Sequence, residues 1–287
     1  MGAGEEQHVP VLRDAVLEQL NLSAEGIYVD GTFGRGGHSR AILEQLGPAG
    51  RLLVIDRDPQ AIEVAEKLAA SDSRVTVLRG SFGDIGRSIE AQGLSGRVDG
   101  VLIDLGVSSP QLDDAERGFS FMRDGPLDMR MDPDAGLSAS DWLNEATEKD
   151  MARVIARFGE EKAARRIARA ICREREQQRI SRTRQLADII ESVIPRRGKG
   201  KHPATKTFQA VRIHINNELG ELQSFLDSIL GVLSVGGRLC VISFHSLEDR
   251  MIKRFLRDHS RVDPALSRLP VVMNTSTDGP NAPMKRP

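Results

Sequence analysis

The chain of 287 residues has only two cysteines, Cys172 and Cys240, and they lie far apart. Two scattered thiols form neither a disulfide framework nor a zinc site, which favours a reducing compartment. The start of the chain is acidic and lacks the basic and apolar regions of a signal peptide. No apolar run approaches the length of about 20 residues that spans a bilayer. We therefore expect a cytoplasmic protein without a membrane-spanning segment.

Aromatic residues are also scarce, at 4% of the chain, and neither sign of charge is in overall excess. The 40 lysines and arginines are matched by 41 aspartates and glutamates, which gives a formal net charge of -1. Taken whole, this balance argues against a protein that binds a polyanion. Hydrophobic residues make up 39% of the chain, which excludes a largely disordered or fibrous protein.

The overall balance conceals one strongly basic segment. Residues 153–206 contain 16 basic and 6 acidic residues, a net charge of +10. The rest of the chain then has 24 basic and 35 acidic residues, a net charge of -11. Basic helices are often only solvated faces, but a local excess of this size is typical of a phosphate-binding surface. With so few aromatics, we expect recognition of nucleic acid to depend on phosphates and shape more than on stacking.

Short apolar runs alternate with helical patterns over the first hundred residues. Strands are predicted at four such runs: 27–29, 52–55, 75–78 and 98–104. Helices are expected over 38–46 and from Pro59, and a later run at 237–243 predicts one more strand. This alternation is typical of βαβ units and a parallel sheet, so the fold class is α/β.

A different pattern separates the fourth run from the last one. Residues 105–136 are rich in Gly, Pro and Asp and predict a long functional loop, whereas residues 140–194 predict consecutive helices. A linker follows at 195–206, and one long amphipathic helix is expected over 208–226. The simplest interpretation is an all-helical domain inserted into the α/β domain.

A glycine-rich turn follows the first predicted strand, over residues 30–38. Its glycines allow the backbone to approach a ligand closely, and the next helix starts with free N–H groups. Asp56 ends the second strand, where a carboxylate accepts hydrogen bonds from the hydroxyls of a ribose. Such turns also occur for tight packing alone, but the turn and Asp56 together predict an adenosine-containing cofactor.

The sequence also discriminates among cofactors. The dinucleotide fingerprint G-x-G-x-x-G is incomplete, because Ser39 occupies its third glycine position, and a P-loop is excluded, because no Gly-Lys-Ser/Thr follows. An acidic residue just before the glycines, Asp30, is the pattern of enzymes that use S-adenosylmethionine (SAM). Asp104 ends the fourth strand, where open α/β sheets bind ligands. We therefore favour SAM, and an NAD-dependent oxidoreductase is the main alternative.

Seven segments carry a more specific pattern: VDGTFGRGGHS at 29–39, IDRD at 55–58, DLGVSSPQLD at 104–113, FSF at 119–121, PLDMRM at 126–131, KHPAT at 201–205 and SFHSLEDR at 243–250. In this order they resemble the bacterial 16S ribosomal RNA (cytosine-N4)-methyltransferases. The resemblance implies a Rossmann-like, class I SAM-dependent methyltransferase sheet with the helical insert. It implies a discontinuous SAM-binding domain, residues 1–110 and 207–287, and an inserted loop and helical RNA-recognition domain, residues 111–206.

The resemblance also implies a site and a substrate. SAM contacts are implied at Gly36, Gly37, His38, Asp56, Phe82, Asp104 and Gln111. The implied substrate is one cytidine in the decoding region of 16S rRNA in the small ribosomal subunit. A methyltransferase acting on DNA or protein would share the cofactor site, and only this resemblance selects rRNA. The chain ends at Pro287, where such proteins continue to a last strand, so we expect that strand to be missing or replaced.

The exocyclic N4 of cytosine is a poor nucleophile, so alignment must supply much of the catalysis. Many amino-methyltransferases use an Asp/Asn/Ser-Pro-Pro-aromatic loop after the fourth strand, but Ser109-Pro110-Gln111 lacks the second proline and the ring. We expect Asp104 and Ser109 to accept hydrogen bonds from N4, and Phe244 to stack on the base. His245 is interpreted either as a base or as a capping residue.

The loop over residues 105–136 is expected to cover a base that has been turned out of its stack. Arg117, Arg123 and Arg130 in this loop either contact phosphates or pair with neighbouring aspartates. The six histidines show no metal-ligand spacing, so no metal is expected. The oligomeric state is left open, with a homodimer among the alternatives.

Overall fold

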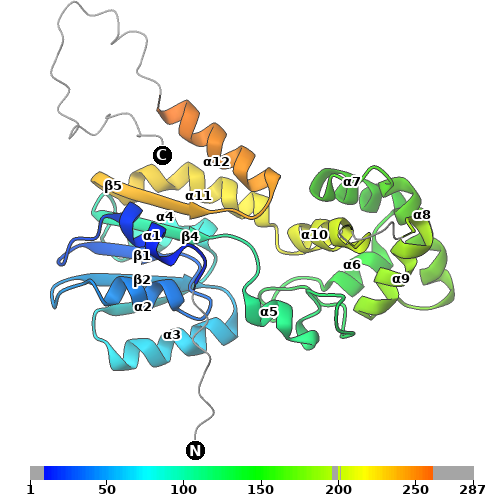
Figure 1. Ribbon diagram of the computed structural model, residues 1–287, viewed down its shortest axis with the longest axis horizontal. Helices are drawn as coiled ribbons and strands as arrows, with labels where there is room; N and C mark the ends of the chain where they lie inside the picture. Colours follow the sequence, from blue (N-terminus) through cyan, green and yellow to red (C-terminus); the bar gives the residue numbers. More distant parts are fainter. Residues whose placement is uncertain (1–9, 196–199, 201, 261–287) are drawn as a thin grey trace, which may run out of the picture. The chain divides into compact units, whose positions relative to one another are not determined.

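The computed structural model describes residues 10–195, 200 and 202–260. The chain divides into two compact units: Met1–Gly106 with Gly220–Pro287, and Val107–Leu219 (Figure 1). We call them the sheet unit and the helical unit. Residues 196–199 and 201 of the expected linker lie outside the described residues, and so do residues 261–287, where the last strand is expected to be missing or replaced. In the part that is described, no helix is long and apolar enough to cross a membrane.

A five-stranded parallel sheet forms the centre of the sheet unit, in the order β3-β2-β1-β4-β5 (Figure 1). Its strands are β1 (Ile27–Asp30), β2 (Arg51–Asp56), β3 (Val75–Arg79), β4 (Val98–Asp104) and β5 (Leu233–Ile242). The strands β1 to β3 are added toward one edge of the sheet, and β4 and β5 toward the other. Open α/β sheets bind ligands where the strand order reverses in this way, here at the carboxyl ends of β1 and β4. The expected α/β, Rossmann-like fold is confirmed.

Helices cover both faces of this sheet. They are α1 (Arg13–Leu20), α2 (Gly37–Leu43), α3 (Pro59–Ser71), the 3₁₀ turn η1 (Phe82–Asp84), α4 (Ile85–Ala91), α11 (Glu218–Val232) and α12 (Ser246–His259). Leu53 and Ile103 belong to the core under α4, α11 and α12, whereas Val54 and Leu102 pack with α1, α2 and α3. Because both faces are buried, the strands read as continuous apolar runs rather than as alternating ones.

The helical unit contains the long loop and most of the insert. Its elements are α5 (Ser109–Asp113), the 3₁₀ turn η2 (Ala115–Arg117), α6 (Ala139–Glu145), α7 (Glu148–Gly159), α8 (Ala164–Gln177), α9 (Thr183–Val193) and α10 (Ala204–Ile215). Thr147 caps the start of α7, because the N–H of Asp150 donates to the Thr147 hydroxyl at 3.1 Å. Ile167, Ile171 and Leu186, from α8 and α9, are fully buried in one core. The division places α10 in this unit, so the boundary falls at 219 instead of the expected 206.

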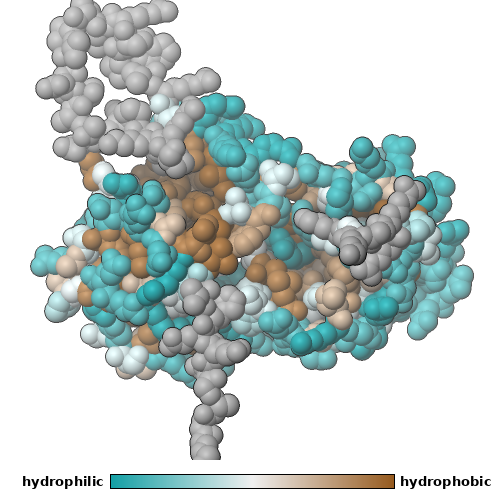
Figure 2. Space-filling view, viewed as in Figure 1, coloured by the Kyte–Doolittle hydropathy of each residue, from teal (hydrophilic) through white to brown (hydrophobic). Residues whose placement is uncertain are grey.

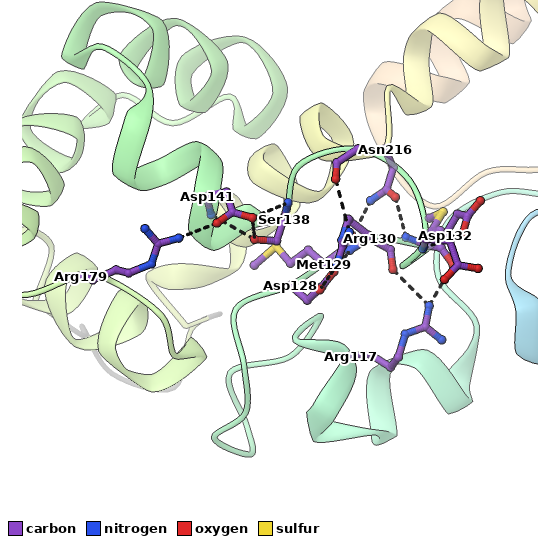
Figure 3. Close-up of polar contacts among 12 residues, drawn as sticks. Arg117, Asp128, Met129, Arg130, Asp132, Ser138, Asp141, Arg179 and Asn216 are labelled. Carbon is purple, nitrogen blue, oxygen red and sulfur yellow. Dashed lines mark hydrogen bonds and ion pairs between the residues drawn. The ribbon is translucent and has the colours of Figure 1, made fainter.

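The prediction of one long helix over 208–226 is wrong. Two helices, α10 and α11, are separated at Asn216 and Asn217, and Asn217 has a left-handed φ of 49°. The break allows the Asn216 side chain to act within the helical unit, where its Oδ1 accepts from the N–H of Met131 and its Nδ2 donates to the carbonyl of Met129, both at 2.7 Å (Figure 3). The amphipathic pattern continues through this break and does not reveal it, because the backbone groups that Asn216 binds lie about 85 residues earlier in the chain.

The long loop is held by its own arginines. Arg117 is buried and donates to the carbonyls of Arg130 and Met131, at 3.1 and 3.0 Å (Figure 3). Arg130 forms a two-point ion pair with Asp128, and Arg123 donates to the carbonyl of Asp113 at 2.9 Å. Between the two alternatives for these arginines, internal pairing is therefore what the structure shows: Arg130 pairs with a neighbouring aspartate, and Arg117 and Arg123 donate to backbone carbonyls of the loop.

Replacement of Asn216 by alanine will destabilise the helical unit. The change leaves a buried N–H at Met131 and a buried carbonyl at Met129 without this partner, at a cost of about 2–4 kcal/mol in the free energy of unfolding. Urea denaturation measures it. Gln177→Ala, on the exposed end of α8, is the matched control and should change the stability by about 0.5 kcal/mol or less. An equal effect of the two variants would contradict a role for Asn216 as a support of the loop.

Candidate functional site

The glycine-rich turn connects β1 to α2 and has the backbone that only glycine adopts easily. Gly34 and Gly36 have φ values of 56° and 73°. A Cβ atom on Gly36 would lie 2.6 Å from the ring of Phe33. Gly36 is the residue before α2, and Gly37 is the first residue of that helix. The predicted turn and helix start are thus present, with backbone N–H groups at the carboxyl end of the sheet.

Asp56 ends β2 and is held by this turn. Its carboxylate accepts the N–H of Gly34 at 2.8 Å and the N–H of Asp58 at 2.9 Å. Burial raises the pKa of Asp56, and these hydrogen bonds oppose that increase. A carboxylate oxygen can accept two hydrogen bonds, and the Asp56 side chain is half-buried. Asp56 therefore retains the capacity to accept from the hydroxyls of a ribose.

Asp30, at the end of β1, does not face the surface. It is 1% exposed, and its two oxygens accept from the Ser39 hydroxyl at 2.6 Å and from the N–H of Thr32 at 3.2 Å. Burial raises the pKa of Asp30 to about 6. This carboxylate therefore holds the turn in place through Thr32 and Ser39.

His38 and Asp104 form the part of the site with unsatisfied polar atoms. His38 is 7% exposed, and its Nε2 lies 3.7 Å from Oδ2 of Asp104. Within the described chain, neither ring nitrogen of His38 has a hydrogen-bond partner, and neither does Oδ1 of Asp104. Burial lowers the pKa of His38 and raises the pKa of Asp104 to about 6. Buried polar atoms without partners, next to a group with a perturbed pKa, are characteristic of a ligand site.

The sheet register brings Asp30, Asp56 and Asp104 to the same face. Asp30 is in register with Val54 and Leu102, and the other two carboxylates lie two residues further along their strands. Residues two apart in a strand point to the same face. None of the three carboxylates pairs with a lysine or arginine of the described chain. Such a site favours a ligand with positive charge and disfavours an anionic one.

Two phenylalanines of the sheet unit lie in different environments. Phe82 starts η1 and packs edge-on against Phe225, with ring centroids 6.0 Å apart. Phe244 follows β5 and is 59% exposed, next to the backbone of Gly106 after β4. Its exposed ring is consistent with the expected stacking role.

His245 is the N-cap of α12. Its Nδ1 accepts from the N–H of Glu248 at 3.4 Å, and the Glu248 carboxylate accepts from the N–H of Phe244 at 3.0 Å. Between the two interpretations of His245, the structure therefore shows the capping one. The cap also fixes the backbone that carries Phe244.

Ser109 and Gln111 belong to the helical unit. Ser109 is the first residue of α5, and Gln111 completes a capping box with Ser108, whose N–H donates to Oε1 of Gln111 at 3.0 Å. Gln111 is buried. Its side-chain carbonyl thus stabilises the start of α5.

Sequence reasoning missed a cavity of about 330 Å³ in the helical unit, whose lining includes Trp142, His214, Arg153 and Asp150. The rings of Trp142 and His214 are 4.5 Å apart, and burial lowers the pKa of His214. These residues come from α6, α7 and α10, so no spacing between neighbouring residues in the sequence predicts this cavity. The only signal in the sequence was the presence of a single tryptophan in a chain so poor in aromatics.

Three exposed arginines form a stripe along α8 with spacing i, i+4, i+8: Arg165, Arg169 and Arg173. Arg169 lies 3.6 Å from Glu148, whereas Arg175, also on α8, donates to the carbonyls of Leu143 and Ala146. Figure 2 shows hydrophilic residues over the outer surface of α8 and α9. Part of the predicted basic excess therefore has structural partners, and Arg165 and Arg173 of the α8 stripe remain as an exposed cationic surface.

Relatives of the chain share most of its length. It is 57% identical over 263 residues to "Ribosomal RNA small subunit methyltransferase H" of Xanthomonas campestris pv. campestris (strain B100), covering 92% of this chain and 76% of that protein. It is 59% identical over 253 residues to the protein of the same name from Alcanivorax borkumensis, covering 88% and 80%. A crystal structure of a putative rRNA-methylase from Clostridium thermocellum aligns at a TM-score of only 0.28, with 20% identity over 33% of this chain and 49% of that one.

The fold is therefore assigned from its own strand order, and the family from sequence. Residues 5–284, nearly the whole chain, match a single family description. The turn, the three strand-end carboxylates and the helical insert all lie within this match. The chain belongs to the MraW methylase family.

Proposed function

We propose that the protein is an enzyme that transfers a methyl group from SAM to the exocyclic N4 of one cytidine in the decoding region of 16S rRNA. The observation that carries this proposal is the His38–Asp104 pair, with its buried and unpartnered polar atoms, beside the glycine turn. The rRNA substrate is supported by the names of relatives that are 57% and 59% identical to the chain.

The residues present fit SAM as the cofactor. Asp56 accepts from the ribose hydroxyls, while Gly36 and Gly37 permit close approach of the backbone. His38 and Asp104 supply polar atoms that otherwise lack partners in the described chain. When bound, SAM supplies an electrophilic methyl group on a positively charged sulfur. Phe82 and Gln111 are proposed as further contacts of the cofactor.

An NAD-dependent oxidoreductase is disfavoured by the charge of the site. A dinucleotide carries a negatively charged pyrophosphate, which would meet Asp56 and Asp104, and neither has a lysine or arginine partner in the described chain. SAM carries both an ammonium and a sulfonium group. Electrostatics therefore support the SAM assignment independently of the missing third glycine.

The acceptor chemistry requires orientation of the base and removal of hydrogen from N4. Asp104 and Ser109 are proposed to accept hydrogen bonds from N4, which increases the electron density available on nitrogen. Phe244 is proposed to stack on the base and hold it in line with the methyl group. A carboxyl group with a pKa near 6, such as Asp104, is ionised at neutral pH and suited to this role.

The helical unit is proposed to bind the RNA. The α8 stripe provides positive charge for phosphates, and the cavity with Trp142 and His214 provides rings beside Arg153 for an unpaired base. We propose a cytoplasmic location, because the small ribosomal subunit is assembled there.

Mass spectrometry of 16S rRNA tests the proposed function. rRNA from cells that lack the protein should gain the mass of one methyl group on a single cytidine after incubation with the protein and SAM. Isothermal titration with SAM and with NAD gives a second measurement, and binding of SAM alone is expected. If no cytidine gains a methyl group, the substrate assignment fails. Binding of NAD without SAM would favour the oxidoreductase.

Truncation of Phe244 should impair methyl transfer without unfolding the protein. Because a base–aromatic stack is removed, Phe244→Ala should lower kcat/KM by about tenfold. Ser109→Ala removes an acceptor for N4 and should lower kcat/KM severalfold. Leu230→Ala, another exposed apolar side chain of the sheet unit, is the control and should leave kcat/KM unchanged. An unchanged kcat/KM in both Phe244→Ala and Ser109→Ala would contradict the proposed acceptor site.

Charge reversal on α8 should weaken RNA binding in a salt-dependent way. Arg165→Glu with Arg173→Glu removes two cations that bind phosphates, so the slope of log K against log salt should become shallower by about one for each phosphate that is no longer neutralised. Fluorescence anisotropy with a 16S rRNA fragment measures the slope. Arg97→Glu, on an exposed part of the sheet unit, is the control for charge. A slope that stays at the wild-type value would place the RNA surface elsewhere.

A further inference from the structure

A turn of the helical unit, residues 120–125, presents a large apolar side chain to solvent. Met122 in this turn is 80% exposed, more than any other large apolar side chain of the described chain. The next residue, Arg123, donates to the carbonyl of Asp113, which follows the 43% exposed Leu112 on α5. A single exposed apolar side chain is common on protein surfaces. What distinguishes Met122 is how its backbone is held and which charges lie beside it.

The backbone just before Met122 is anchored in the helical unit. The ring of Phe121 packs against the rings of His202 and Phe208, with centroids 4.4 and 4.9 Å apart. The N–H of Met122 donates to the Ser120 hydroxyl at 3.2 Å. Phe121 therefore packs against the core while its neighbour Met122 points out to solvent.

The backbone just after Met122 is held by the start of α9. The Thr183 hydroxyl, which is fully buried, donates to the carbonyl of Arg123 at 3.2 Å and accepts the N–H of Gly125 at 3.1 Å. The N–H of Thr183 donates in turn to the carbonyl of Gly125 at 3.0 Å. Since the turn is fixed on both sides, placing Met122 against a partner requires little further ordering of the chain.

Positive charge lies on the two segments that meet at this turn. Residues 120–125 and 179–184 together contain four arginines and one aspartate, a net charge of +3. Arg182 pairs with Asp124 at 2.6 Å, and both side chains are about half exposed. Exposed ion pairs add little stability, so this arginine can exchange its carboxylate for a phosphate. The contact of Arg123 is with a carbonyl, which leaves its charge uncompensated by that contact.

We propose that Met122 is an apolar wedge which enters the base stack of the bound rRNA and fills the gap left by the turned-out cytidine. The inference rests on the proposed function, which requires that a stacked base be turned out of the RNA. RNA offers stacked bases to the apolar side chain and phosphates to the arginines. Methionine is unbranched and polarisable, so it fits a gap of irregular shape. Met122 is thus a positioning residue that acts through the RNA.

Fluorescence of 2-aminopurine tests the wedge directly. The probe is a folded fragment of the 16S decoding region with 2-aminopurine beside the target cytidine. Wild type should raise its fluorescence on binding, because the stack opens. Met122→Ala should lose most of this rise while the Kd from anisotropy changes by about threefold or less, since the phosphate contacts remain. Met122→Leu keeps an apolar side chain of similar size and should retain the rise. Leu230→Ala, which removes another exposed apolar side chain, should match wild type.

Methyl transfer separates this role from a merely structural one. On the folded fragment, Met122→Ala should lower kcat/KM about tenfold, because the gap is no longer filled. On a fragment with abasic linkers on both sides of the cytidine there is no stack to open, so Met122→Ala and wild type should be equally active.

An equal loss on both fragments, or no rise of fluorescence with wild type, would overturn the inference. So would a loss seen on intact small subunits but not on the naked fragment, which would assign Met122 to a contact with protein. If wild type methylates neither fragment nor the small subunit, the proposed function itself fails.

Discussion

The hydrogen bonds that hold the buried Asp30 carboxylate are the constraint on which the rest of the site depends. Through Ser39 they fix the first turn of α2, and through Thr32 they connect β1 to the end of β4. The glycine turn has to follow the path between these points, and this path explains the positive φ of Gly36. The proposed site is therefore held in place partly by Asp30 and Ser39, which are both buried. An ionised carboxylate is costly to bury, and its stability in this place depends on the donors around it.

A comparable internal support exists in the helical unit. Asn216 interrupts what would be a continuous helix and binds the backbone of Met129 and Met131. Arg117 satisfies further carbonyls of the same loop. A long loop rich in Gly, Pro and Asp is thus ordered by side chains instead of by secondary structure. Because these polar groups are buried, each one left without a partner would cost free energy. This is why the loop has one defined path.

Much of the fold could be predicted, because local patterns determine it. Apolar runs identified all five strands, and the Pro59 signal placed the start of α3 correctly. The break at Asn216 could not be predicted, because periodicity continues through it and its partners are distant in sequence. Asp30 illustrates the same limit within the site. Its position before the glycines suggested a ligand, and only the packing of Ser39 against it showed an internal role.

The sequence by itself determined the order of strands and helices, the glycine turn, the family and the basic character of the insert. These features depend on the type and spacing of neighbouring residues. Only the tertiary structure decided which charged groups are compensated, since this depends on what lies beside them in space. It left Asp30, Asp56 and Asp104 on one face without a lysine or arginine partner in the described chain. Coulomb interactions and burial act across strands and helices, and no linear pattern records them.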